Sequence, residues 1–360
     1  PTSGGMAKRS IAYAQEVKAE AIQVFASNPR GWAMPDANPQ ADAEFRESAQ
    51  SLDVTTYVHA PFLINLGSPT EGTYENSLAS TEYSLRRSRE LGALGAVIHT
   101  GSAVKEEFVD QAWKQIHEGM MPILEKLSND DPFLLLEPTA GQGQSLVKKL
   151  EELVKYFEAL GFHPKVGICI DTCHVFAAGH DITSKSGIDQ MLAGLLANVP
   201  QERIKLVHAN DSMDICGALK DRHQSIGEGH IGQKPFQMLM EHPAMAGVPF
   251  ILETPGEEPE HGREVKILKN TSSLYNVPPT ILPVNNSNGF SISSITYNNS
   301  TKIVRLFLTH QFSGGDFPFE VSKSILVENI SVGVGSTGSG FNSKDYNYTL
   351  FPVSGVNTAA

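Results

Sequence analysis

The sequence predicts an α/β fold, a closed (β/α) barrel, followed by a small all-β module. Apolar strand candidates alternate with helix candidates at a period of roughly 35–45 residues up to about residue 256. Seven strands of this kind indicate a parallel sheet closed into a barrel. The pattern ends abruptly after Asn270, where Ser, Asn, Thr and Gly become abundant and the helical pattern stops.

The central strand is the most informative element. Val166 to Ile170 is a continuous apolar run, which is typical of a buried strand in a parallel sheet. The run ends in Asp171, and His174 follows three residues later. Barrel enzymes place their chemistry at this end of each strand, and a carboxylate beside an imidazole suits zinc.

The other elements follow from the same reading. The predicted strands are 21–27, 55–60, 96–101, 132–139, 166–171, 203–211 and 248–256. The predicted helices are 6–19, 41–52, 76–92, 106–127, 146–160, 187–198 and 234–243. Between the first strand and the next helix lies a Pro-rich loop with Arg30 and Trp32.

Six of the seven predicted strands end in an imidazole or a carboxylate. These residues are His59, His99, Glu137, Asp171, His208 and Glu253. One histidine in such a place is commonly a hydrogen-bonded core residue, but six strands sharing the feature is not expected by chance. Because buried charges must be paired or bind metal, we predict a polynuclear metal centre with zinc as the first choice.

Three residues beyond the strand ends add a further candidate site. Asp221 and His223 lie two positions apart in a loop, and His174 follows the central strand. We expect the three to form a more open site on the same face of the barrel.

Composition limits the possible functions and compartments. The formal net charge of −12 taken alone argues against nucleic-acid binding, which uses Lys and Arg, although bound dications would offset part of it. The three cysteines, Cys169, Cys173 and Cys216, do not form a disulfide framework and suit a reducing compartment. Without a targeting segment or a transmembrane run in the sequence, we expect an intracellular protein, cytoplasmic and associated with the nucleoid.

At this point the residues resemble a known family, the endonuclease IV type of apurinic/apyrimidinic (AP) endonuclease. The resemblance covers about residues 1–268, and the patterns DTCH-x-FAAG and DRH-x-S-x-GEG-x-IG are its most specific parts. The matching segments are NPRGW (28–32), HAPFLINLG (59–67), HTGS (99–102), LEPTAGQG (136–143), IDTCHVFAAGHD (170–181), HANDS (208–212), DRHQSIGEGHIG (221–232) and ILETP (251–255).

The resemblance implies a TIM barrel that holds three zinc ions. His59 and His99 would hold one ion, and Glu137 would bridge it to the second. The remaining ligands would be Asp171, His208 and Glu253 for the second ion and His174, Asp221 and His223 for the third.

The resemblance also implies base-excision repair. The family cuts double-stranded DNA on the 5′ side of an abasic site, leaves a 3′-hydroxyl and flips the damaged nucleotide out of the stack. We expect catalysis to depend on Glu137, Glu253 and Asp171, with one of the two glutamates orienting the water; the sequence does not choose between them. Arg30, Phe62 and Leu63 match the family's DNA-contacting positions, where Tyr is common in place of Phe62.

Two departures from the family accompany the match. The chain begins in the loop that follows the family's first strand, so we expect a (β/α)8 barrel lacking that strand, over residues 1–270. A linker (271–283) and a β-sandwich (284–360) follow, weakly similar to bacterial immunoglobulin-like modules, with no known function or partner. Its predicted strands are 290–297, 302–310, 324–334 and 345–353.

Two other functions fit parts of the pattern. Related metal-bearing barrels are sugar isomerases or epimerases, but such an enzyme needs neither the Asp221–His223 site nor the Arg30 loop. An inactive barrel remnant that carries a binding module is the third reading, and it predicts no bound zinc. For the endonuclease we expect a monomer without membrane contact.

Overall fold

The computed structural model describes residues 9–272, 290–298, 303–310, 323–327 and 350–351. The chain divides into two compact units, Pro1–Leu268 and Lys269–Ala360. The first unit contains the predicted parallel sheet, and the second contains a separate antiparallel sheet.

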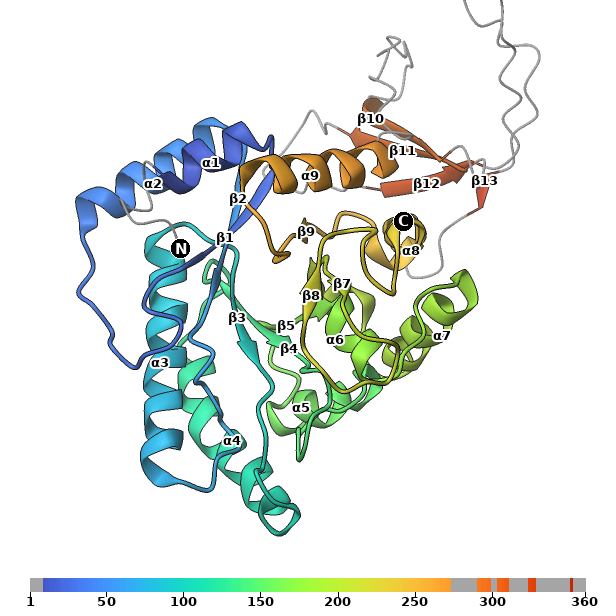
Figure 1. Ribbon diagram of the computed structural model, residues 1–360. Helices are drawn as coiled ribbons and strands as arrows, with labels where there is room; N and C mark the ends of the chain where they lie inside the picture. Colours follow the sequence, from blue (N-terminus) through green and yellow to red (C-terminus); the bar gives the residue numbers. More distant parts are fainter. Residues whose placement is uncertain (1–8, 273–289, 299–302, 311–322, 328–349, 352–360) are drawn as a thin grey trace, which may run out of the picture. The chain divides into compact units, whose positions relative to one another are not determined.

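The sheet of the first unit has seven parallel strands that neighbour one another in chain order (Figure 1). They are β1 (Ala21–Phe25), β2 (Thr55–His59), β3 (Gly95–His99), β4 (Phe133–Glu137), β5 (Val166–Asp171), β6 (Ile204–His208) and β9 (Phe250–Ile251). All seven predicted strands of this unit are confirmed, and β1 and β9 are the two edges of the described sheet. The arrangement is a nearly closed (β/α) barrel.

Helices connect the strands. They are α1 (Ile11–Glu16), α2 (Pro39–Ser51), α3 (Glu71–Glu90), α4 (Val109–Leu124), α5 (Leu153–Ala159), α6 (Thr172–Ala177), α7 (Lys185–Leu196), α8 (Gln233–Met240) and α9 (Glu258–Ser272). In the part of the chain that is described, no helix is long and apolar enough to span a bilayer.

Two helices and one short hairpin were not predicted. The six residues of α6 follow β5 directly, so the apolar run conceals the change of structure; the Asp171 side chain begins the helix by accepting the His174 N–H. The mostly charged sequence of α9 gives only a weak apolar stripe. The hairpin pairs β7 (Asp211–Ser212) with β8 (His223–Gln224), which are too short for a period-2 pattern.

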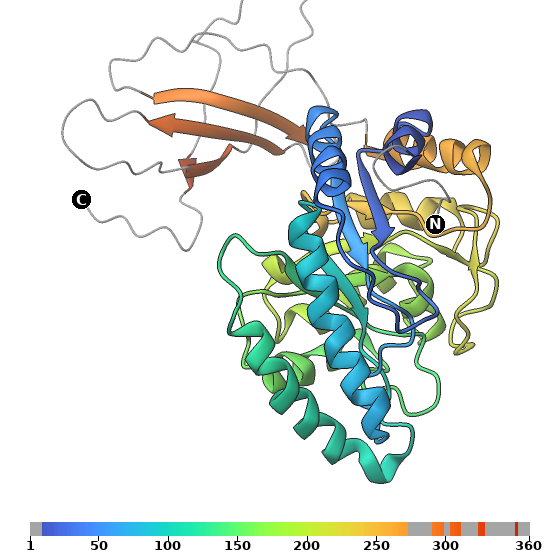
Figure 2. The same cartoon turned by 90° about the vertical axis from the view of Figure 1, so that its left-hand side faces the viewer.

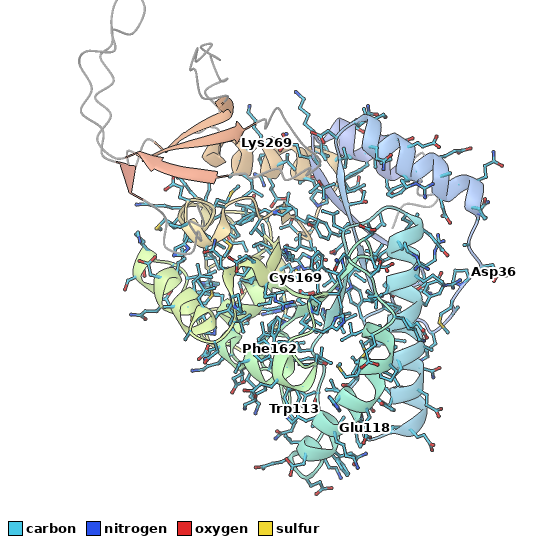
Figure 3. The ribbon with its side chains drawn as sticks, turned by 180° about the vertical axis from the view of Figure 1, so that it is seen from behind. Asp36, Trp113, Glu118, Phe162, Cys169 and Lys269 are labelled. Carbon is cyan, nitrogen blue, oxygen red and sulfur yellow. The ribbon has the colours of Figure 1, made fainter. Side chains whose placement is uncertain are left out.

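The interior of the barrel contains one buried layer of side chains. Six strands each contribute one residue to it: Tyr57, Val97, Leu135, Cys169, Leu206 and Ile251. Figure 3 shows Cys169 in the middle of this unit. Side chains alternate along a strand, so residues two positions later also face the interior, at the C-terminal mouth of the barrel.

The outer face of the sheet is covered by helices. Figure 2 shows α3 and α4 running along the outside of the strands. Between helices and strands lies the main apolar core, which includes Ile116, Leu134, Phe157 and Ile168, all fully buried. Each such side chain contributes about 1.5–3 kcal/mol on burial, so this layer stabilises the frame that holds the mouth.

The second unit has a four-stranded antiparallel sheet. Its strands are β10 (Phe290–Asn298), β11 (Ile303–His310), β12 (Lys323–Val327) and β13 (Leu350–Phe351), in that order. They overlap the four predicted strands. The described residues here form one sheet, so the second sheet of a sandwich stays a prediction, and nearly all of the predicted linker lies outside the described residues.

A buried ion pair joins α3 to α2. Arg87 donates two hydrogen bonds of 2.7 Å to the Asp42 carboxylate, and both side chains are buried. Arg87→Ala leaves Asp42 buried without a partner, so we expect the free energy of unfolding to fall by about 3–5 kcal/mol. Urea titration followed by fluorescence measures this in the barrel unit, because both tryptophans, Trp32 and Trp113, lie there.

Lys126→Ala is the matched control. Lys126 pairs with Glu82 at 2.8 Å on the surface, where both side chains are more than half exposed. We expect a change of at most about 1 kcal/mol. Equal effects of the two substitutions would contradict the structural role of the Arg87 pair.

Candidate metal centre

The structure brings the six strand-end residues together at the mouth of the barrel. Five of them lie two positions after a residue of the inner layer on the same strand, and Glu253 lies two positions after Ile251, just beyond the end of β9. All six therefore face the interior. His174, Asp221 and His223 lie beside them, and short distances between nitrogen and oxygen atoms divide the nine residues into three adjoining groups.

The first group contains His59, His99 and Glu137. The Nε2 atoms of the two histidines lie 3.3 and 3.6 Å from Glu137 Oε2. Glu137 and His59 are buried. One carboxylate oxygen thus faces two imidazoles, and the three ligand atoms can surround one cation.

The second group shares Glu137 and adds Asp171, His208 and Glu253. His208 Nδ1 lies 3.1 Å from Glu137 Oε1 and 3.2 Å from Glu253 Oε2. Asp171 Oδ2 is 3.9 Å from the same nitrogen. Glu137 therefore presents one oxygen to each of two groups, which is the arrangement of a bridging ligand.

The third group lies beside the hairpin. Asp221 Oδ1 is 3.2 Å from His174 Nε2 and 3.1 Å from His223 Nε2. Pairing of β7 with β8 holds His223 in place, and no tight turn of an extended loop is needed. Asp171 Oδ2 also lies 3.6 Å from His223 Nε2, so Asp171 adjoins two groups rather than one.

Hydrogen bonds orient four of the five imidazoles. His59, His174 and His223 each place Nδ1 against a backbone carbonyl, those of Ala60, Pro138 and Glu253, at 2.7, 3.0 and 3.1 Å. A carbonyl only accepts, so Nδ1 carries a proton, and Nε2 is the nitrogen that faces the carboxylates and would bind a cation. His208 is reversed: its Nε2 contacts Gln23 Oε1 at 2.9 Å, and Nδ1 faces the carboxylates.

These residues fit a group of zinc ions. Ligand atoms about 2.0–2.2 Å from a tetrahedral Zn²⁺ lie roughly 3.3–3.6 Å apart, close to the observed separations of 3.1–3.9 Å. The Nε2 atoms of His174 and His223 are buried and make no hydrogen bond within the described structure. A buried ring nitrogen without a hydrogen-bond partner is costly unless it binds a cation.

Electrostatics at the site favour cation binding as well. Burial opposes ionisation of Glu137, yet its histidine neighbours, His208 foremost, hold the pKa of that carboxyl well below its usual range. Burial lowers the pKa of His99 to about 4, which leaves it neutral at pH 7. For His223 burial lowers the pKa, but Asp171 and Asp221 outweigh it and raise the pKa to about 9.

Two cysteines lie beside the ligands. Sulfur atoms of Cys169 and Cys173 are within reach of the second and third groups. Burial raises the pKa of both thiols to about 12. A neutral thiol is a poor metal ligand, since the thiolate is the form that binds, so the oxygen and nitrogen atoms are the better donors here.

Sequence reasoning missed two supporting residues, Asn210 and Gln23. Asn210 is fully buried, donates to Asp171 Oδ2 at 2.7 Å and accepts the Glu253 N–H at 2.8 Å. Gln23 donates to Glu253 Oε1 at 2.6 Å. Each stands two positions from an inward-facing residue, His208 or Ala21, so the period-2 pattern of a strand predicts that both face inward. Their side chains are uncharged amides, so a pattern of histidines and carboxylates does not include them.

The three predicted DNA-contacting residues lie on two loops at the same mouth. The Phe62 N–H donates to Pro29 O at 2.9 Å, which joins the Arg30 loop to the loop after β2. Phe62 is 45% exposed and stacks on the His99 ring with centroids 5.9 Å apart, and Leu63 and Arg30 are exposed as well. An open aromatic ring therefore stands directly over the first group.

Comparison with known proteins gives consistent relatives. Residues 11–271 match the family of xylose isomerase-like TIM barrels. Proteins described as probable endonuclease 4 from Streptomyces avermitilis and Streptomyces coelicolor are both 53% identical over 270 residues, covering 75% of this chain and 87% and 92% of theirs. The crystal structure of endonuclease IV from Thermus thermophilus aligns with a TM-score of 0.66 at 28% identity, over 76% of this chain and 96% of that one.

The likeness to more distant structures shows the fold alone. A D-tagatose 3-epimerase-like protein aligns with a TM-score of 0.54 at 19% identity, over 71% of this chain and 89% of that one.

Zinc binding should release protons. At pH 7 the metal-free site holds a proton on His223, whose pKa is raised to about 9, and a cation must displace it to reach Nε2. We expect calorimetric titration of the metal-stripped chain, in buffers of different ionisation enthalpy, to show at least one proton released at pH 6.5. Release should fall as the pH rises through 9, and the affinity should increase over the same interval.

If the histidine ligands were already neutral at pH 6.5, zinc would displace no proton from them, and proton release would not change with pH. Proton release that stays constant between pH 6.5 and 9 would contradict the electrostatic description of the third group.

Proposed function

The chain belongs to the endonuclease 4 family of AP endonucleases, within the xylose isomerase-like TIM barrels, and on this premise we propose that it cleaves duplex DNA at abasic sites. The cut falls at the phosphodiester bond on the 5′ side of the site and leaves a 3′-hydroxyl. One observation carries the proposal: nine imidazoles and carboxylates from separate segments converge at one barrel mouth. Their nitrogen and oxygen atoms lie at the separations expected of atoms that bind a shared cation.

We assign three zinc ions to this mouth. The first would be held by His59, His99 and Glu137, which bridges to the second. The other ligands are Asp171, His208 and Glu253 for the second ion and His174, Asp221 and His223 for the third. The contact between Asp171 and His223 supports placing the second and third ions close together.

Bound zinc would supply Lewis acidity toward the phosphoryl oxygens and a lower pKa for water. Glu137 is buried and ionised, which suits a bridging ligand and makes it a weak proton acceptor. The Glu253 side chain is 23% exposed, so water reaches it. We therefore assign Glu253 to orient the attacking water. Its oxygen bonds to phosphorus as the bond from phosphorus to the 3′-oxygen breaks, and the proton that the water loses balances the one that the 3′-oxygen takes up.

The rim residues suit the recognition of a damaged duplex. A nucleotide without a base leaves the stack at low cost, because no base pair is broken. Side chains must then fill the gap, and exposed apolar wedges do this in kinked DNA. Phe62 and Leu63 are exposed beside the metal centre, and Arg30 on the adjoining loop supplies a cation for phosphate.

The remaining assignments are coarser. We propose that the enzyme works as a monomer near the nucleoid. The predicted linker over 271–283 begins within α9, which ends at Ser272, and most of residues 273–360 lies outside the described residues, so the immunoglobulin-like module over 284–360 stays a prediction. The sugar isomerase reading has the shared fold in its favour, but the Arg30 and Phe62 loops favour DNA.

Incubation with a duplex that carries one tetrahydrofuran abasic analogue tests the proposal. On a denaturing gel we expect a single cut on the 5′ side. Glu137→Gln keeps the side-chain volume but weakens the bridge between two groups, so we expect kcat to fall at least about 100-fold with little loss of DNA binding.

Three controls separate the readings. An undamaged duplex should stay intact, and His99→Ala should abolish the cut. Near-full nicking by Glu137→Gln would remove the bridging assignment, and no cut by a zinc-loaded wild-type chain would remove the endonuclease proposal itself.

Phe62→Ala should weaken binding to the abasic duplex. Loss of one aromatic stacking contact costs about 1–3 kcal/mol, so we expect Kd to rise roughly 10-fold for the abasic duplex and little for the undamaged one. Phe62→Tyr, which keeps the ring, should bind as the wild type does. Fluorescence anisotropy at fixed salt measures all three; an equal Kd for Phe62→Ala and wild type would show that the ring lies outside the interface.

A further inference from the structure

We infer that Gln23 is a positioning residue of the metal centre, holding His208 and Glu253 in the geometry that binds the second ion. The inference rests on the proposed function and extends it to a residue on β1, the strand whose end carries no charged ligand. Gln23 lies two positions after Ala21, which packs against the inner layer, and it pairs in register with Tyr57 of that layer.

The Gln23 amide makes two hydrogen bonds whose directions are fixed. Its Nε2 donates to Glu253 Oε1 at 2.6 Å, and its Oε1 lies 2.9 Å from His208 Nε2. An ionised carboxylate only accepts, so the amide NH₂ must face Glu253. The amide oxygen then faces His208 and accepts its Nε2–H.

This pair of bonds turns the right atoms toward the metal site. With Nε2 bonded to Gln23, His208 directs Nδ1 to the carboxylates, where it makes a hydrogen bond of 3.1 Å with Glu137 Oε1 and lies 3.2 Å from Glu253 Oε2, so Nδ1 is the nitrogen that would bind a cation in place of a proton. Glu253 uses Oε1 for Gln23 and turns Oε2 toward the same point. One amide therefore selects the tautomer of one ligand and the rotation of another.

The contact also crosses the seam of the barrel. Among the described strands β1 and β9 are the edges of the sheet, and no backbone ladder joins them. Gln23 comes from the first edge, and Glu253 follows the second. The side-chain hydrogen bond thus links the two edges of the sheet at the level of the metal centre. A shift of β1 would therefore displace two ligands, His208 and Glu253.

Two substitutions separate the halves of this role. Gln23→Leu removes both hydrogen bonds, whereas Gln23→Glu keeps an acceptor for His208 and removes the donor to Glu253. We measure zinc content, and zinc affinity by competition with a chelator, in the full chain. We expect Gln23→Leu to lower the affinity for one ion 10- to 100-fold, Gln23→Glu to lower it less, and the remaining ions to be unaffected.

A second readout reports the tautomer directly. Long-range ¹H–¹⁵N spectra of the zinc-loaded chain, with the His208 signal assigned by His208→Asn, should show Nε2–H in wild type and in Gln23→Glu. In Gln23→Leu we expect that proton to exchange faster with water. Gln50→Leu, on the exposed face of α2, is the matched control and should match wild type in both readouts.

The outcomes distinguish the two proposals. If the wild type binds zinc and nicks DNA while both Gln23 variants keep wild-type affinity and His208 signals, the role of Gln23 is overturned alone. If the wild type binds no zinc, the metal centre and the role of Gln23 are overturned together. Should Gln23→Leu fail to fold, Gln23→Glu, which conserves volume, carries the test through its zinc affinity.

Discussion

The structure depends on a cluster of carboxylates and imidazoles buried at the mouth of a barrel. Glu137, Asp171 and His208 are fully buried, within 4 Å of one another or of a further ligand. Buried charges of this kind are costly unless they neutralise each other or bind a cation. Without metal, neighbouring carboxylates raise the pKa of His223, and neighbouring histidines lower the pKa of Glu137. Bound cations would neutralise the same carboxylates without protons.

Much of this was predictable because the barrel repeats one rule. Each strand is an apolar run whose last inward position lies at the mouth, so strand-end residues converge whatever their separation in sequence. His59 and Glu253 are far apart in the chain yet belong to one cluster. Boundaries such as the start of α3 at Glu71 were less accurate, because helix ends depend on local capping and tertiary packing rather than on apolar periodicity.

Other features could not be predicted, and for a physical reason. Asp171 adjoins His208 because β5 and β6 pair in register. It also adjoins His223 of the β7–β8 hairpin, and no linear pattern specifies this second contact. Asn210 and Gln23 are uncharged, and an amide gains its role from which partner each of its two ends meets. Their inward positions can be predicted from the alternation of side chains along a strand, but their hydrogen-bond partners are known only from the structure.

The net charge of −12 is compatible with a DNA substrate for the same reason that the cluster needs metal. Four of the acids are the carboxylates at the mouth, where each lies close to at least one histidine. Three dications there would offset half of the formal charge, at the point where a phosphate would approach in the proposed reaction. The potential that DNA meets is set locally, by the centre and by the cation of the adjoining Arg30 loop, because charges more than about 10 Å away are largely screened in physiological salt. The whole-chain charge therefore does not decide whether the mouth accepts DNA.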